Sequence, residues 1–204
     1  MALITIEGVD GTGKTTLAHA LADALGRRGQ TVRCLREPGG VAVSEAIRAL
    51  VKDPALVIGD RAEALLYAAA RAQLVEERLL PALAAGETVI LDRYIDSSLA
   101  YQGGGRGLGV GAVAAINAFA AGGLAPDRTL WLDLAPELAA ARATARGEAP
   151  DRLEQAGEAF YARVRAAYAA LAAAEPGRII RIDAGQSPEA VLDAALTALA
   201  DLTF

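Results

Sequence analysis

The chain has 204 residues, of which 53% are hydrophobic and 22% charged, and its formal net charge is −5. This length predicts one domain spanning residues 1–204, and the composition excludes a disordered or fibrous chain. The acidic balance argues against a nucleic-acid partner, and the absence of an apolar run of about 18 residues or of a basic leader argues against a membrane or export, so we expect a cytoplasmic protein.

The N-terminal stretch has the order strand, glycine-rich turn, helix. Apolar and β-branched residues at 3–6 predict the strand, and helix-forming residues begin at Lys14. Between them, the spacing Gly8-x-x-x-x-Gly13-Lys14-Thr15 is typical of a phosphate-binding loop, with an ammonium for the β- and γ-phosphates and a hydroxyl for Mg²⁺. We expect the donor nucleotide to contact Gly8, Asp10, Gly11, Thr12, Gly13, Lys14, Thr15 and Thr16.

Strands and helices alternate along the rest of the chain. Further strands are expected at 31–36, 88–92, 129–134 and 178–183, and helices at 17–28, 44–51, 60–85, 112–121, 136–146, 154–175 and 188–201. Ser187 is placed to cap the last helix, and the glycines at 103–107 argue against an uninterrupted helix over 97–107. The alternation predicts an α/β P-loop NTPase fold, in which helices cover both faces of a five-stranded parallel sheet.

Two polar residues follow the apolar strand at 88–92. Asp92 stands at the tip of this strand and is the natural partner of Thr15 around Mg²⁺, unless it is simply a solvated strand end. Arg93 would then face the gap between the donor and acceptor phosphates, where fixed positive charge stabilises a phosphoryl-transfer transition state.

Three other features have two interpretations each. Arg142, Arg146 and Arg152 flank a break at 147–150, which suits either a lid over ATP or a solvated helix face. Tyr67 and Arg71 are four residues apart on one helix, which suits either base recognition or ordinary packing. The single cysteine, Cys34, lies in an apolar strand, and we expect it to be a buried thiol.

Five motifs together resemble those of the bacterial thymidylate kinase family. They are GVDGTGKTT at 8–16, REPGG at 36–40, DRY at 92–94, SSLAYQGGGRG at 97–107 and DRLE at 151–154. The resemblance implies transfer of the γ-phosphoryl group of ATP to dTMP, giving dTDP and ADP, with Mg²⁺ as metal and a homodimer as the assembly.

The resemblance also implies roles for individual residues. Arg48 and Arg93 would hold the dTMP phosphate, Tyr67 would stack on thymine and Arg71 would meet a base carbonyl. Tyr101 would crowd a 2′-hydroxyl on the sugar. The full acceptor set is Asp10, Glu37, Pro38, Arg48, Tyr67, Arg71, Arg93, Ser97, Ser98, Tyr101 and Gln102, and the metal would lie at Thr15 and Asp92.

Two points bear on how closely the chain follows the family pattern. Tyr67 stands where many members have phenylalanine, and the family divides by whether the catalytic arginine lies in the phosphate loop or in the lid. Gly11 and Thr12 leave no arginine in the phosphate loop, so the lid at about 142–154 must supply it. Arg146 and Arg152 are therefore expected beside Lys14, Asp92 and Arg93 among the catalytic residues, with Arg142 next.

Two alternative functions are weaker. In a deoxynucleoside kinase Glu37 would act as a base on a neutral 5′-hydroxyl, whereas the pair Arg48 and Arg93 favours an acceptor that already carries phosphate. A GTPase switch usually has an Asn-Lys-x-Asp motif, but the only asparagine here, Asn117, is followed by alanine.

Overall fold

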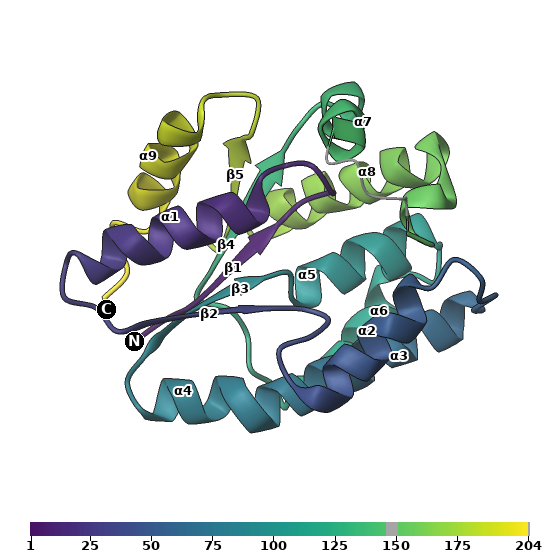
Figure 1. The fold of residues 1–204 in the computed structure, drawn as a ribbon, viewed down its shortest axis with the longest axis horizontal. Coiled ribbons are helices and arrows are strands. Elements are labelled where there is room, and N and C mark those ends of the chain that lie inside the picture. Colours follow the sequence, from purple (N-terminus) through teal and green to yellow (C-terminus); the bar gives the residue numbers. More distant parts are fainter. Residues whose placement is uncertain (146–150, 204) are drawn as a thin grey trace.

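The computed structural model describes residues 1–145 and 151–203, with a parallel sheet at the centre (Figure 1). Its strand order, β2-β3-β1-β4-β5, puts β1 between β3 and β4. The strands are β1 (Leu3–Glu7), β2 (Val32–Arg36), β3 (Thr88–Asp92), β4 (Arg128–Asp133) and β5 (Ile179–Asp183). The five strands and the fold class predicted from the sequence are therefore confirmed.

Helices cover both faces of the sheet (Figure 1). The helices α1 (Lys14–Gly26) and α9 (Pro188–Ala198) lie on one face. The other helices are α2 (Ala42–Lys52), α3 (Asp60–Leu74), α4 (Leu80–Ala84), α5 (Ile95–Ser98), α6 (Val110–Ala120), α7 (Pro136–Ala145) and α8 (Glu158–Ala174). Among the described residues, no helix has both the length and the apolar character that crossing a membrane requires.

The two faces are built from alternating residues of the same strands. Ile4 and Ile6 pack in one buried cluster with Leu21 of α1, whereas Leu3 packs with Leu79 on the opposite face. Successive side chains of a strand point to opposite faces, so a strand that is apolar at every position is covered on both. This burial holds the carboxyl ends of β1 and β3 side by side.

The stretch after β3 differs from the prediction. The chain stays helical from α5 through a π-helical segment, η2 (Leu99–Gly105), so the expectation that glycine interrupts the helix is wrong for the glycines at 103–105. The helix ends at Gly105, so the stretch 97–107 is not helical to its end. A Cβ at Gly104 would lie 2.5 Å from the Cβ of Ala167, and one at Gly105 would lie 2.6 Å from the ring of Phe160. The close approach of α8 leaves no room for a Cβ at these positions, which explains why glycine stands here. The packing against α8 offsets the low helix propensity of glycine.

Smaller differences concern helix boundaries. The predicted helix at 60–85 is continuous but passes through a π-helical segment, η1 (Val75–Leu79), between α3 and α4. The helix predicted from 154 begins as α8 at Glu158, because Gly157 has a φ of 83° and separates it from a short 3₁₀ turn. The predicted cap of α9 is confirmed, since Ser187 Oγ accepts a hydrogen bond from the amide of Ala190.

The prediction of a buried cysteine is wrong. Cys34 is exposed. Its strand, β2, is at the edge of the sheet and is paired only with β3. An edge strand is covered less completely than the central strands, and an apolar sequence pattern does not distinguish the two positions.

Candidate active site

The phosphate loop connects β1 to α1 and depends on glycine at both ends. Gly8 has a φ of 137°, and a Cβ there would lie 2.5 Å from the carbonyl oxygen of Leu132. Gly13 precedes α1 in a left-handed conformation with a φ of 90°. The loop therefore approaches β4 closely and brings the amino end of α1 to the carboxyl edge of the sheet, which is an arrangement suited to an anion.

Lys14 is folded back against this loop. Its Nζ donates to the carbonyl oxygen of Val9 at 2.9 Å, and the same oxygen accepts from Thr12 Oγ1 at 2.9 Å. Burial lowers the pKa of Lys14 to about 8, and the nearby positive charge of Arg93 acts in the same direction. The loop thus holds a buried ammonium group whose charge a polyphosphate would stabilise.

Thr15 and Asp92 meet at the predicted metal position. Because β1 and β3 are neighbours, Ile6 lies opposite Asp92, and Thr15 Oγ1 donates to Asp92 Oδ2 at 2.8 Å. Hydroxyl and carboxylate oxygens fit Mg²⁺, which usually takes few protein ligands and completes its octahedron with phosphate oxygens and water. The described part of the chain has no group of three or more histidine, cysteine or acidic side chains that could hold a metal alone.

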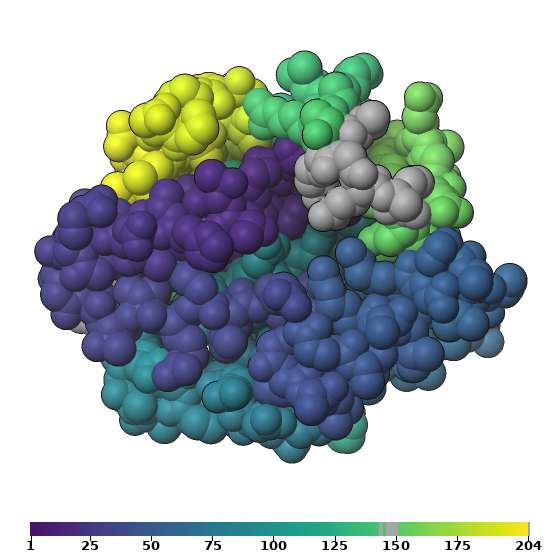
Figure 2. Space-filling model, in the orientation of Figure 1, coloured from purple at the N-terminus to yellow at the C-terminus, as the bar shows by residue number. Residues whose placement is uncertain are grey.

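A cavity lies beside the phosphate loop. Figure 2 shows the N-terminal segment and the helices α2 and α3 on opposite sides of a recess with the residues around β3 at its floor. All eleven residues expected on the acceptor side line this cavity, together with three that the sequence reasoning missed. The lining comprises Asp10, Glu37, Pro38, Arg48, Lys52, Tyr67, Arg71, Arg93, Ser97, Ser98, Tyr101, Gln102, Asp151 and Leu153.

Arg93 lies between the loop and the cavity. It has a φ of 70° and is the only non-glycine residue with positive φ in the described ranges 1–145 and 151–203. Its guanidinium donates to Gly8 O at 2.9 Å and to Asp10 Oδ1 at 3.0 Å, and it also reaches Tyr101 Oη at 3.3 Å. The left-handed turn after β3 thus returns this side chain to the phosphate loop.

Arg71 is fixed at the bottom of the cavity by several acceptors. It forms a buried ion pair with Glu37 at 2.5 Å, and it donates to Ser98 Oγ at 3.0 Å and to the Tyr94 carbonyl at 2.9 Å. A further acceptor is Asn117 Oδ1 on α6. Burial raises the pKa of Glu37 to about 7, while the charge of Arg71 opposes this shift. Arg71 is therefore held rigidly, which suits recognition more than a mobile surface role.

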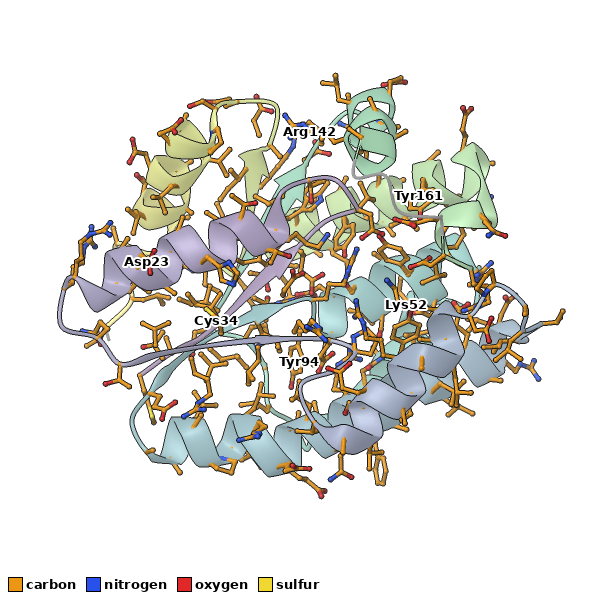
Figure 3. All side chains as sticks on the ribbon, viewed as in Figure 1. Asp23, Cys34, Lys52, Tyr94, Arg142 and Tyr161 are labelled. Carbon is orange, nitrogen blue, oxygen red and sulfur yellow. The ribbon has the colours of Figure 1, made fainter. Side chains whose placement is uncertain are left out.

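Two of the three lid arginines contact other parts of the protein. Arg152 donates to Glu63 Oε2 at 2.6 Å and to the Val51 carbonyl at 2.9 Å, so it lies against α2 and α3. Arg142 on α7 donates to the Ala184 carbonyl at 3.0 Å, in the turn after β5 (Figure 3). The third, Arg146, lies outside the described residues.

Several residues around the site were missed by the sequence reasoning. Lys52 forms an ion pair with Asp151 at 3.0 Å, and both residues line the cavity. The one sequence feature that could have pointed to Lys52 is that lysine is scarce in this chain. Glu63 is fully buried and accepts from Gln102, Arg106 and Arg152. Its place on a helix rich in charged residues does not distinguish this carboxylate from a solvated one.

Comparison with known proteins is consistent across sequence and structure. The family model of thymidylate kinase matches residues 6–195. The thymidylate kinases of Alkalilimnicola ehrlichii and Deinococcus radiodurans are 48% and 50% identical to this chain, over 97% and 96% of it and 91% and 94% of their own lengths. The crystal structure of thymidylate kinase from Ehrlichia chaffeensis superposes with a TM-score of 0.78 at 30% identity, covering 97% of this chain and 98% of that one.

Proposed function

The chain belongs to the thymidylate kinase family and transfers the γ-phosphoryl group of ATP to dTMP, giving dTDP and ADP, and from this premise we propose which residues carry the reaction. The position of Arg93 supports this assignment. Its guanidinium donates a hydrogen bond to Gly8 in the phosphate loop and also lines the cavity that contains the expected acceptor residues. A donor phosphate in the loop and an acceptor phosphate in the cavity would both lie beside this one cation.

The protein contributes mainly position and charge. Lys14 and the loop amides hold the donor phosphates, while Arg48 and Arg93 hold the phosphate of dTMP so that its oxygen faces the γ-phosphorus. Both guanidinium groups also oppose the negative charge that spreads over the transferred group. Thr15 and Asp92 would hold Mg²⁺, which would offset the negative charge of the donor phosphates.

The deeper part of the cavity selects the nucleoside. Tyr67 offers a ring on which thymine stacks, and Arg71, Ser98 and Gln102 offer polar atoms to its edge. Tyr101, whose ring packs edge-on against Phe160 and whose hydroxyl reaches Arg93, stands beside the deoxyribose and leaves little room for a 2′-hydroxyl.

A comparison of acceptors tests the function directly. ADP formation is measured with ATP and Mg²⁺ against dTMP, dUMP, dCMP, AMP and unphosphorylated thymidine. We expect dTMP to give the highest kcat/KM and thymidine to give no turnover, because the two cavity arginines require a phosphate. Faster turnover of thymidine than of dTMP would instead identify a deoxynucleoside kinase.

Among the lid arginines, we propose Arg146 as the one that reaches the transferred phosphoryl group, because Arg142 and Arg152 both have partners elsewhere. Replacing Arg146 by alanine should lower kcat by about 10²- to 10³-fold, the usual effect of losing one transition-state donor. Arg152→Ala should lower kcat less than tenfold and act mainly on KM, because the substitution removes the contact between Arg152 and Glu63. The reverse order of effects on kcat would assign the catalytic role to Arg152.

We also propose a homodimer formed through the helices α2, α3 and α6. These helices pack together and expose large apolar side chains, of which Leu65 is 56% exposed and Phe119 is 92% exposed. An exposed apolar surface of this kind is typical of an interface between subunits. Sedimentation equilibrium should give a dimer for the native chain and a monomer for Phe119→Asp. The control Leu138→Asp, on α7, should stay dimeric; a monomeric native chain would rule out the proposal.

A further inference from the structure

We propose that Glu7 is a positioning residue for phosphoryl transfer, which holds the turn at Arg93 so that the guanidinium stays on the phosphate loop. The inference rests on the function proposed above for Arg93. It assigns a role to a carboxylate that does not line the cavity and that the sequence reasoning did not single out.

Glu7 is the last residue of β1 and is completely buried. Its Oε1 accepts from the amide of Tyr94 at 2.8 Å, and its Oε2 accepts from Ser97 Oγ at 2.5 Å and from Tyr168 Oη at 2.9 Å. Burial, together with the charge of Asp96, raises the pKa of Glu7 to about 7, against the effect of these hydrogen bonds and of Arg93. Burying a carboxylate costs free energy, and a buried carboxylate at the end of β1, beside the phosphate loop, is a candidate for a role in the site.

The partners of Glu7 support both the backbone and the side chain of Arg93. On the backbone side, the Arg93 amide donates to the Ile6 carbonyl at 3.0 Å and the next amide, that of Tyr94, donates to Glu7. On the side-chain side, Ser97 Oγ, which donates to Glu7, lies 3.2 Å from Arg93 Nη1. The end of β1 therefore holds both the left-handed backbone and the serine against which the guanidinium rests.

This arrangement has a consequence for Arg93. A positive φ is unfavourable for any residue with a Cβ and persists only where surrounding contacts enforce it. If the Tyr94 amide loses its acceptor, the turn can relax, and the guanidinium then leaves Gly8 and Asp10. The loss falls on the acceptor phosphate and the transferred group, whereas the loop that binds ATP keeps its own contacts.

Two conservative replacements separate the features of Glu7. Glu7→Asp keeps the charge but is one methylene shorter, so it cannot span the distance to Tyr94 and Ser97 together. Glu7→Gln keeps the length and one carbonyl oxygen for Tyr94 but has no charge. We expect kcat/KM for dTMP to fall about 30-fold or more in Glu7→Asp and about tenfold in Glu7→Gln, with KM for ATP within about threefold of the native value.

A double-mutant cycle with Arg93→Gly identifies the route of the effect, because glycine keeps the left-handed turn while removing the guanidinium. In that background the Glu7 replacements should lower kcat/KM no further. Tyr168→Phe is the matched control: it removes one donor to Glu7 and a hydrogen bond with Ser97 Oγ at 3.0 Å, but it leaves the Tyr94 amide bonded to Glu7, so its kcat/KM should stay within about threefold. Thermal melting should show every variant folded at the assay temperature.

The possible failures are distinguishable. Native rates in both folded Glu7 variants, a Tyr168→Phe loss as large as that of Glu7→Asp, or Glu7 effects that persist fully beside Arg93→Gly would each overturn the positioning role. None of these outcomes affects the assignment of the reaction, which fails only if the native enzyme does not phosphorylate dTMP.

Discussion

Replacing Lys14 by alanine should lower kcat by about three orders of magnitude while leaving the fold intact. The ammonium lies inside the phosphate loop and supplies charge to the phosphates as the γ-phosphoryl group transfers. The loop keeps its shape without it, because the Val9 carbonyl still accepts from Thr12 Oγ1. The measurement is kcat at saturating ATP and dTMP, with circular dichroism as the check on folding. A folded variant with near-native kcat would contradict the assignment.

The pH dependence gives a second measurement of the same group. A lysine loses its charge as the pH rises through its pKa, and burial lowers the pKa of Lys14 to about 8 in the free enzyme. The value of kcat/KM for ATP should therefore fall above about pH 8. Bound phosphate favours the ammonium, so kcat itself should fall only at higher pH. Lys14→Arg, which keeps its charge throughout this range, should have no such fall, whatever its absolute rate.

Replacing Arg93 by glycine should lower kcat/KM for dTMP by about 10³-fold and leave KM for ATP within a few-fold. Glycine adopts the φ of 70° without strain, so the turn persists and only the guanidinium is lost. The acceptor phosphate and the transition state both lose this cation.

The control for Arg93→Gly is Arg165→Ala. Arg165 lies on α8 and forms an ion pair with Asp133 at 2.7 Å. It does not line the cavity, so its replacement by alanine should change kcat/KM less than twofold. Steady-state kinetics with varied dTMP at saturating ATP measures both variants. A native kcat/KM in Arg93→Gly would show that the reaction does not depend on the Arg93 guanidinium.

Much of the local structure could be predicted from the sequence. The strand, glycine-rich turn and helix at the N-terminus depend on glycine geometry and apolar periodicity, which short segments contain. The same holds for the N-cap Ser187 and for the pair Tyr67 and Arg71, which a helix brings to one side and which both line the cavity. Glycine propensity failed in η2, because packing against α8 outweighs a preference of about 1 kcal/mol per residue.

The sequence by itself determined the chain order of the elements, the phosphate-loop geometry and the types of residue available at each strand end. Only the tertiary structure decided which of those ends meet. The order β2-β3-β1-β4-β5 places Asp92 beside Thr15, leaves Cys34 on an exposed edge and brings Tyr94 onto Glu7. The same packing gives Arg71 its buried acceptors Glu37 and Asn117. The physical reason is range: periodicity and turn chemistry act over a few residues, whereas these contacts join residues more than twenty positions apart through the crossovers of the sheet.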